Sequence, residues 1–215
     1  MSEKPEYEKN EKSEKNEKKV SRILVLVSGN GTNLQALIDA ERQGGLGNGK
    51  IAGVISDTAG VFALERAKGA GIPAYTALPC KSLPKQERRL ELSGRILAKA
   101  LELKIDLIVC AGFLSILRGD IIAVYERGMI NIHPSLLPKF GGRGMYGERV
   151  HRAVLASGEA ESGCTVHFVD AGTDTGRILL QRTVPVLAGD TPETLAGRIR
   201  VQEHAAVVEA VRNLA

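Results

Sequence analysis

The sequence of 215 residues contains no tryptophan and only four phenylalanines and four tyrosines. So few aromatic rings give little support to a protein that stacks nucleic-acid bases. The net charge of +4 is too small for the basic footprint of a nucleic-acid-binding domain, although it suits small anionic ligands. We therefore expect small-molecule substrates and no nucleic-acid partner.

Cysteines are scarce, and apolar runs are short. The three cysteines, Cys80, Cys110 and Cys164, are odd in number and form no CxxC pair. Cys110 and Cys164 lie in apolar runs and are expected to be reduced core residues. The four histidines are scattered and show no metal-site spacing with a cysteine, so we expect no metal site. No apolar segment resembles a signal sequence or reaches membrane-spanning length, so we expect a cytoplasmic protein with no membrane partner. A monomer and a homodimer are both open.

The first 20 residues differ from the rest of the chain. Residues 1–19 contain six lysines and six glutamates and almost no apolar side chain. Such a segment cannot bury enough surface to offset the entropy lost on ordering, which predicts a disordered tail over residues 1–20. A tail that binds a partner is the alternative. Residues 21–215 suit one domain with a sizeable core.

From residue 21 onward, apolar runs alternate with amphipathic segments. Strands are expected over 22–27, 51–56, 73–76, 105–110 and 129–133, and helices over 32–42, 61–68 and 85–104. The helical period of the last segment runs through Leu90, Leu97 and Leu101. This alternation predicts a Rossmann-like α/β fold, in which helices flank a mostly parallel sheet.

The pattern changes after Pro138. A glycine-rich loop over 140–147 precedes a short helix over 151–157, strands over 164–169 and 178–186, and a helix over 192–214. We therefore expect two halves, about 21–128 and about 129–215, with the second completing a cleft.

The most informative segment is NIHPSLLP at residues 131–138. Side chains two residues apart on a strand share a face, so Asn131 and His133 are expected side by side. Pro134 and Pro138 must end the strand and begin a stiff loop. An amide donor beside an imidazole suits acyl transfer, because one stabilises an oxyanion and the other moves a proton. Without its neighbours, His133 would more often be a structural histidine.

A second motif, SGNGTN at residues 28–33, is called the glycine loop below. It separates the first expected strand from the first expected helix, where glycines let the backbone approach an anion and helical N–H groups point at it. The loop is neither GxGxxG nor a Walker A sequence, so it indicates a single phosphate and not a dinucleotide. A tight turn with a helix cap is the alternative.

Two polar segments and several shorter motifs complete the pattern. The loop over 170–176 carries Asp170 and Asp174, and QEH at 202–204 lies in the last expected helix. With NIHPSLLP they resemble the phosphoribosylglycinamide formyltransferase family of folate-dependent enzymes, as do VSGNGTNLQA at 27–36, AGF at 111–113, GCTVHFV at 163–169 and DTG at 174–176. The motifs occur in family order. Methionyl-tRNA formyltransferases and formyltetrahydrofolate deformylases share the NIHPSLLP-like segment, but the glycine loop and QEH favour the first family.

The resemblance implies transfer of the formyl group of 10-formyltetrahydrofolate to the amine of glycinamide ribonucleotide in purine (IMP) biosynthesis, without a metal. It implies that Asn131, His133 and Asp174 are catalytic. The other implied contacts are Gly31, Thr32 and Asn33 for the phosphate, Glu203 for the glycinamide end, Leu114, Ser115, Ile116, Leu117 and Asn131 for the folate, and Arg89 (or Arg88) for its acidic tail. The two halves are then a phosphate-binding half and a catalytic, folate-binding half. Outside this context, Glu203 would be an ordinary helix-surface charge.

The chain departs from the family pattern at two places. Family members usually have Met-Arg where this chain has Leu114-Ser115, which removes a cation beside the folate. Residues 140–147, FGGRGMYG, replace a shorter loop with a Pro-Gly pair. Their glycines predict a mobile flap, with Arg143 on a phosphate or a folate carboxylate. We call residues 140–147 the flap.

Three interpretations stay open from the sequence. His167 either supports the catalytic residues or is a structural histidine. A hydrolase that releases formate from the same folate would act without the ribonucleotide. A non-catalytic nucleotide-binding module would have no use for the complete set of Asn131, His133 and Asp174.

Overall fold

The computed structural model describes residues 20–215, so the expected disordered tail lies outside the described residues apart from Val20. The elements in chain order are β1 (Ser21–Val27), α1 (Thr32–Arg42), β2 (Gly49–Ser56), α2 (Phe62–Gly69), β3 (Ala74–Thr76), α3 (Lys85–Glu102), β4 (Leu107–Cys110), α4 (Asp120–Val124), β5 (Met129–His133), α5 (Glu148–Ser157), β6 (Glu161–Phe168), β7 (Ile178–Pro185) and α6 (Pro192–Leu214). None of the helices in this described part is long and apolar enough to cross a membrane.

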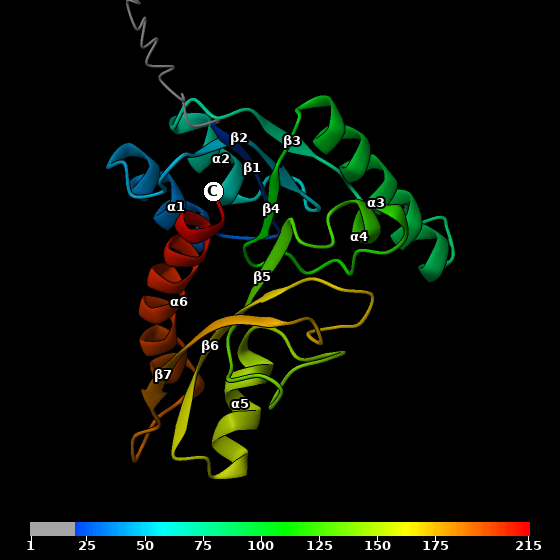
Figure 1. The fold of residues 1–215 in the computed structure, drawn as a ribbon. Coiled ribbons are helices and arrows are strands. Elements are labelled where there is room, and N and C mark those ends of the chain that lie inside the picture. Colours follow the sequence, from blue (N-terminus) through cyan, green and yellow to red (C-terminus); the bar gives the residue numbers. More distant parts are fainter. Residues whose placement is uncertain (1–19) are drawn as a thin grey trace, which may run out of the picture.

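The strands form one seven-stranded sheet in the order β3-β2-β1-β4-β5-β6-β7 (Figure 1). The first five strands pair in parallel, whereas β6 is antiparallel to both β5 and β7. The predicted Rossmann-like fold with a mostly parallel sheet is therefore confirmed. A single sheet runs through both of the halves that the sequence distinguished.

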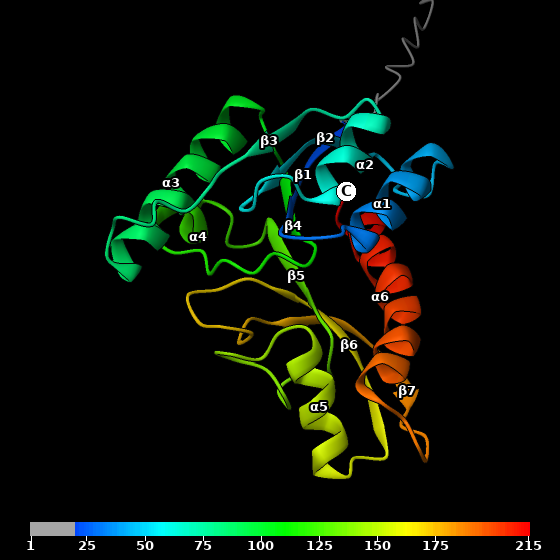
Figure 2. The same ribbon diagram turned by 180° about the vertical axis from the view of Figure 1, so that it is seen from behind.

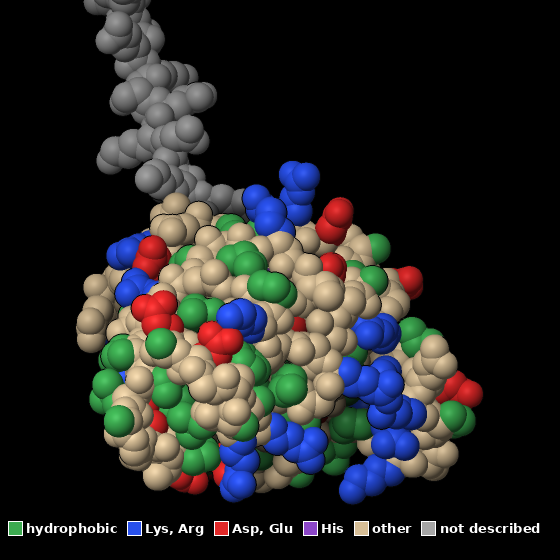
Figure 3. Space-filling view, turned by 90° about the horizontal axis from the view of Figure 1, so that it is seen from below, with side chains coloured by type: hydrophobic (Ala, Val, Ile, Leu, Met, Phe, Trp, Pro, Cys, Tyr) green, Lys and Arg blue, Asp and Glu red, His purple; other side chains and the backbone are tan. Residues whose placement is uncertain are grey.

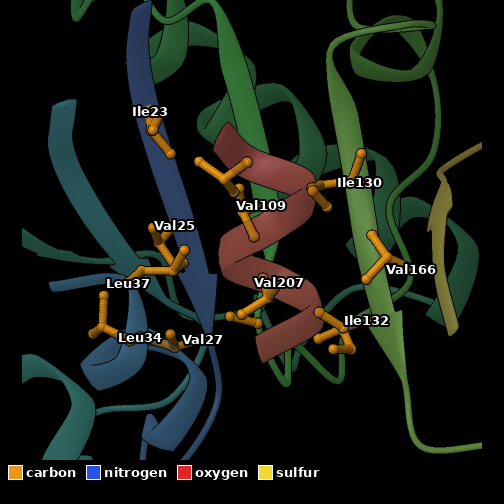
Figure 4. Packing of buried hydrophobic residues seen from close by; sticks show 14 of the residues in the cluster. Ile23, Val25, Val27, Leu34, Leu37, Val109, Ile130, Ile132, Val166 and Val207 are labelled. Carbon is orange, nitrogen blue, oxygen red and sulfur yellow. The ribbon is translucent and has the colours of Figure 1, made fainter. Parts of the chain in front are cut away.

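Helices cover both faces of this sheet. Helices α1 and α6 lie on one side of it and α3 and α4 on the other (Figures 1 and 2). Strand β1 is buried on both faces, because Ile23, Val25 and Val27 belong to one apolar cluster and Leu24 and Leu26 to the other. Such continuous apolar strands are typical of sheets covered on both sides. Figure 4 shows Val207 of α6 among the side chains of β4 and β5.

Helix α3 contains the leucines of the expected helical period, but other residues form its buried face. The segment is helical, but Leu90 and Leu101 are 50% and 57% exposed, and the buried face is formed by Leu92, Ser93, Ile96 and Ala100. The exposed leucines and the buried residues both have helical spacing. A hydrophobic pattern alone would choose the leucines as the buried face, because the other set includes a serine and an alanine. On that buried face, the Ser93 hydroxyl accepts a hydrogen bond from the Arg118 N–H at 2.9 Å.

Two boundaries near α3 also differ from the expectation. The helix ends at Glu102 and not at Lys104, whose φ of 51° is incompatible with a continuing helix. The Ile105 N–H then donates to the Ala100 carbonyl, which delays the start of β4 to Leu107. The short helix α4 was not predicted, because five residues are too few to show a helical period.

The topology fixes where a ligand can enter. After β1 the chain turns toward β2 and β3, whereas after β4 it continues toward β5, so the order of the sheet reverses between β1 and β4. Ligands of open α/β sheets bind in the crevice outside the carboxyl ends of such strands. The two loops also touch here, since the Leu114 N–H donates to the Ser28 hydroxyl at 2.8 Å.

Candidate active site

A cavity of about 790 Å³ lies at the carboxyl ends of β4 and β5, next to the start of α1. Most of the site residues predicted from the sequence line this cavity: Asn33, Arg89, Leu114, Ser115, Ile116, Leu117, Asn131, His133, Asp174 and Glu203. Gly31 and Thr32 are not among the lining residues, although they directly precede Asn33. The structure therefore gathers residues from both halves of the sequence around one space.

Asn131 faces His167 across the β5–β6 ladder, where the two residues are register partners. The Asn131 side-chain amide donates to Nε2 of His167 at 3.1 Å, and Nδ1 of His167 donates to the Phe168 carbonyl at 2.8 Å. Burial lowers the pKa of His167, despite opposing contributions from that carbonyl and from Asp174, so the neutral ring accepts the hydrogen bond. His167 thus orients Asn131, whose second amide N–H remains for a ligand.

His133 is 4% exposed, and its two ring nitrogens have different neighbours. Its Nε2 donates to the Phe140 carbonyl at 2.9 Å, while its Nδ1 lies 3.6 Å from Oδ2 of Asp174. The first contact ties the ring to the start of the flap. The second makes Nδ1 the nitrogen that can exchange a proton near a carboxylate.

Asp174 lies between the two imidazoles. Its Oδ2 accepts a hydrogen bond from the Gly142 N–H at 2.9 Å, and its Oδ1 lies 3.7 Å from Nε2 of His167. The residue has a φ of 57°, a conformation that Asp and Asn tolerate better than most residues. The other carboxylate of this loop, Asp170, caps its own turn by accepting from the Gly172 N–H and the Thr175 hydroxyl.

The opposite end of the cavity contains Glu203 of α6. Burial raises the pKa of the Glu203 carboxyl, while the charge of Arg200 and a hydrogen bond from Asn33 act in the other direction. Arg200 also lines the cavity, and its spacing of three residues from Glu203 on one helix is a sequence signal for a shared face.

His151 of α5 is a further lining residue that sequence reasoning did not propose. It is 6% exposed, and burial, together with Arg200 and His133, lowers its pKa. Its Nδ1 is buried without a hydrogen-bond partner in the described part of the chain. Its place on a predicted helix gave no signal, because the packing of α5 against the site is a long-range contact.

The glycine loop forms the N-terminal end of α1. Gly31 has a φ of 75°, and a Cβ atom there would lie 2.6 Å from the Cβ of Ala63. Within residues 20–215, no side-chain cap accepts a hydrogen bond from the first turn of α1, so its N–H groups are available to an anion. A turn closed by a side-chain cap, the alternative from the sequence, is not what the structure contains at this helix.

Cations gather at the end of the cavity that includes residues 114–117. Burial is the main cause that lowers the pKa of Arg89, and the nearby charges of Arg118 and Arg143 lower it further. The lining here includes Lys85, Arg88, Arg89, Arg118, Arg143 and Arg149. Figure 3 shows Lys and Arg side chains gathered along one side of the face that is seen from below.

Ser115 occupies the position where the family usually has arginine, and its hydroxyl donates to Oδ2 of Asp57 at 2.6 Å. Asp57 is 7% exposed. A cation is present three residues later, at Arg118, which donates to the carbonyls of Leu117 and Gly172. Arg118 was not predicted, although its nearness in sequence to the missing arginine was a usable signal.

The described residues of this site contain neither a metal-binding cluster nor a reactive thiol. Within residues 20–215, no group of three or more His, Cys, Asp or Glu side chains is arranged to hold a metal ion. Cys110 lines the cavity, but burial raises the pKa of its thiol to about 12, which keeps it protonated. The groups presented to a ligand therefore include an amide, imidazoles, carboxylates, guanidinium cations and the Lys85 ammonium.

A model of the family described as Formyl transferase matches residues 21–211 of the chain. The chain belongs to this family. Phosphoribosylglycinamide formyltransferase of Escherichia coli (strain K12) is 40% identical over 183 residues, which cover 85% of this chain and 82% of that protein. The resemblance inferred from the motifs is confirmed.

One further relative is similar in sequence, and one solved structure is similar in sequence and fold. Chloroplastic phosphoribosylglycinamide formyltransferase of Vigna unguiculata is 39% identical over 96% of this chain, which spans 65% of that relative and thus less than two thirds of its length. The crystal structure of glycinamide ribonucleotide transformylase 1 from Symbiobacterium toebii is 42% identical, with a TM-score of 0.82 over 90% of this chain and 86% of that one.

Proposed function

We propose that this protein transfers the formyl group of 10-formyltetrahydrofolate to the amine of glycinamide ribonucleotide, giving formylglycinamide ribonucleotide and tetrahydrofolate for purine (IMP) biosynthesis. The observation that carries the proposal is the single cavity that Asn131, His133 and Asp174 share with Asn33 and Glu203 at one end and Arg89 at the other. A volume of about 790 Å³ lies within the range of small-molecule sites. The names of the relatives support the choice of reaction.

The two substrates enter from opposite ends in this proposal. The N-terminal N–H groups of α1 bind the ribonucleotide phosphate through Gly31, Thr32 and Asn33. Glu203 accepts hydrogen bonds from the glycinamide end. The folate donor lies along residues 114–117 and beside Asn131, and the Arg89 cluster attracts its acidic tail. The half over about 21–128 thus binds the phosphate and contributes residues 114–117 and Arg89 to the folate site. The half over about 129–215 supplies the catalytic groups, of which Asn131 also contacts the folate.

The catalytic residues divide the steps among them. A bond forms between the glycinamide nitrogen and the formyl carbon, and the bond from that carbon to N10 of the folate breaks. The free Asn131 N–H stabilises the oxyanion that develops between these events. His133, protonated at Nδ1, donates to the same oxygen and then gives its proton to the departing N10. Asp174, directly or through water, accepts the proton lost by the amine and returns one to Nδ1 over the 3.6 Å gap.

The remaining features of the proposal concern the setting. The donor is a co-substrate, and no metal takes part. We propose a cytoplasmic enzyme without nucleic-acid or membrane partners, acting as a monomer or a homodimer.

One assay tests the reaction. The protein is mixed with 10-formyl-5,8-dideazafolate, and loss of the formyl group is followed by absorbance with and without glycinamide ribonucleotide. We expect turnover only when the ribonucleotide is present. Formate release without the ribonucleotide would identify a hydrolase, and binding of the ribonucleotide without turnover would identify a non-catalytic module; either result contradicts the proposal.

A further inference from the structure

We propose that Arg66 of α2 is a positioning residue that fixes the glycine loop in its anion-binding shape and supplies the positive charge beside it. This inference rests on the proposed function, because it takes the loop to hold the ribonucleotide phosphate. Arg66 is distant in sequence from the loop, and its side chain does not line the cavity.

All three guanidinium nitrogens of Arg66 donate to the segment that contains the loop. Nε donates to the Asn30 carbonyl at 2.9 Å, and a terminal nitrogen donates to Oδ1 of the same asparagine at 2.8 Å. The other terminal nitrogen donates to Oε1 of Gln35 at 3.0 Å, on the first turns of α1. One planar group therefore holds both the loop and the helix that follows it, which a lysine cannot do with a single ammonium.

The same helix, α2, packs directly against the loop. The Ala63 N–H donates to the Gly29 carbonyl at 3.2 Å, and the Ala63 methyl lies where a side chain at Gly31 would be. The Arg66 guanidinium is also stacked over the Phe62 ring, 4.6 Å from its centroid. Phe62, Ala63 and Arg66 thus form a support that holds the loop at the N-terminal end of α1.

The charge of Arg66 has no direct carboxylate partner within the described residues, since each hydrogen bond ends on a neutral oxygen. The nearest acid in this network is Asp39, which Gln35 contacts through its own amide at 2.9 Å. A guanidinium held by neutral acceptors leaves a positive potential at the loop, which an incoming phosphate can neutralise. Shape and charge therefore depend on the same side chain.

The test separates these two contributions by substituting Arg66 twice. Arg66→Gln removes the charge, and Arg66→Lys keeps it while losing the three-way geometry. We expect Arg66→Gln to raise the KM for glycinamide ribonucleotide by about 10-fold or more, and Arg66→Lys by about 3-fold, as loss of charge-assisted hydrogen bonds implies. The KM for the folate donor and kcat at saturating ribonucleotide should stay within about 2-fold, because the catalytic residues lie on other elements.

Lys68→Gln is the matched control, because it removes the same charge from the same helix. Lys68 pairs with Glu65 at 2.9 Å and has no contact with the loop. Competition by inorganic phosphate gives a second readout, and its inhibition constant should rise in Arg66→Gln but not in Lys68→Gln. Melting temperatures of all variants are measured alongside, and Arg66→Lys decides the matter if Arg66→Gln does not fold.

Two negative results have different meanings. If the wild-type protein neither uses the ribonucleotide nor binds phosphate, the proposed function fails and this inference fails with it. If the wild type does both but the folded Arg66 variants keep the ribonucleotide KM of Lys68→Gln, the proposed function stands and the role of Arg66 is overturned. A fall in kcat without a change in that KM would also overturn it.

Discussion

The two ring nitrogens of His133 face different partners: one faces a backbone carbonyl and the other faces a carboxylate. Because Nε2 donates to the Phe140 carbonyl, the proton that can move is the one on Nδ1, which faces Asp174. On the neighbouring strand, the neutral ring of His167 takes one amide proton of Asn131. These contacts determine which atoms of Asn131 and His133 are free to act.

Asp174→Asn tests the proton-exchange role at this scale. Asparagine keeps the size of the side chain and tolerates the φ of 57°, so the loop should retain its fold. It cannot accept and return a proton, and we expect kcat to fall by about 100-fold or more, as for loss of a general acid–base group. Single-turnover kinetics measure the loss, and an unchanged rate would contradict the assignment.

Glu203→Gln tests the protonation of the Glu203 carboxyl, which lies at the other end of the cavity from the Arg89 cluster. The pKa of Glu203 is raised by burial, so the folded state holds this proton more strongly than the unfolded state. The resulting stability is present below the unfolded pKa and is lost as pH rises through the raised folded pKa. Glutamine is neutral throughout, so the melting temperature of the variant should exceed that of the wild type by an amount that grows with pH over this window.

The control for this prediction is Glu161→Gln, at an exposed position at the start of β6. It should show no such trend in melting temperature. Glu203→Gln should also raise the KM for the ribonucleotide, so that stability and substrate binding change in opposite directions. A melting-temperature difference that does not vary with pH would contradict the burial argument.

The sequence pattern placed Asn131 and His133 side by side, but it left two interpretations of His167 open and gave no signal for His151. Asn131 and His133 follow from a spacing of two on an apolar strand. The contact of His167 with Asn131 depends on the β5–β6 register, and the position of His151 at the cavity depends on the packing of α5; local periodicity contains neither. The proposed ribonucleotide contact at Glu203 came from the family resemblance, because a glutamate on a helix has no distinguishing pattern of its own.

At the scale of elements, long periodic segments were predicted best. The expected helices over 32–42 and 192–214 have the bounds of α1 and α6. The helical spacing of the leucines in α3 predicted the helix but not its buried face, because two sets of residues on this helix have the same spacing. Helix α6 carries Arg200 and Glu203 into the cavity, and it begins at a capping box.

Thr191→Ala tests how that start contributes. The Thr191 side chain accepts from the Thr194 N–H at 3.3 Å, and the Thr191 N–H donates to the Thr194 hydroxyl at 2.9 Å. Loss of a threonine cap typically costs about 1 kcal/mol, so the free energy of unfolding should fall by about that amount in denaturant titrations. Because Glu203 lies three turns away, kcat should not change, and Thr191→Ser should retain most of the stability. A variant as stable as the wild type would show that the cap contributes nothing.

At the scale of the whole molecule, one sheet holds two electrostatic environments in a single cavity. The carboxylate of Glu203 is at one end and the guanidinium groups of Arg89, Arg118 and Arg143 are at the other, with His133 and Asp174 between them. Burial, and after it the charges of Arg118 and Arg143, lower the pKa of Arg89, so an anion placed there relieves repulsion. This arrangement suits a ligand with an acidic tail, and we propose that it compensates for the arginine that Ser115 replaces.

Arg143→Ala tests this compensation through the flap. Arg143 contributes charge to the cluster from the flap. The Asp174 carboxylate is held separately, through the Gly142 N–H at 2.9 Å. Loss of the Arg143 side chain should therefore weaken binding of the folate donor without displacing the Asp174 carboxylate. We expect the KM for the folate donor to rise about 3- to 10-fold and to become less sensitive to salt, as for a partly exposed ion pair. Arg152→Ala is the matched control, because Arg152 pairs with Glu148 on the exposed side of α5 and does not line the cavity. A rise in the KM for the ribonucleotide alone would place Arg143 at the phosphate, and no change in either KM would exclude it from both ligands.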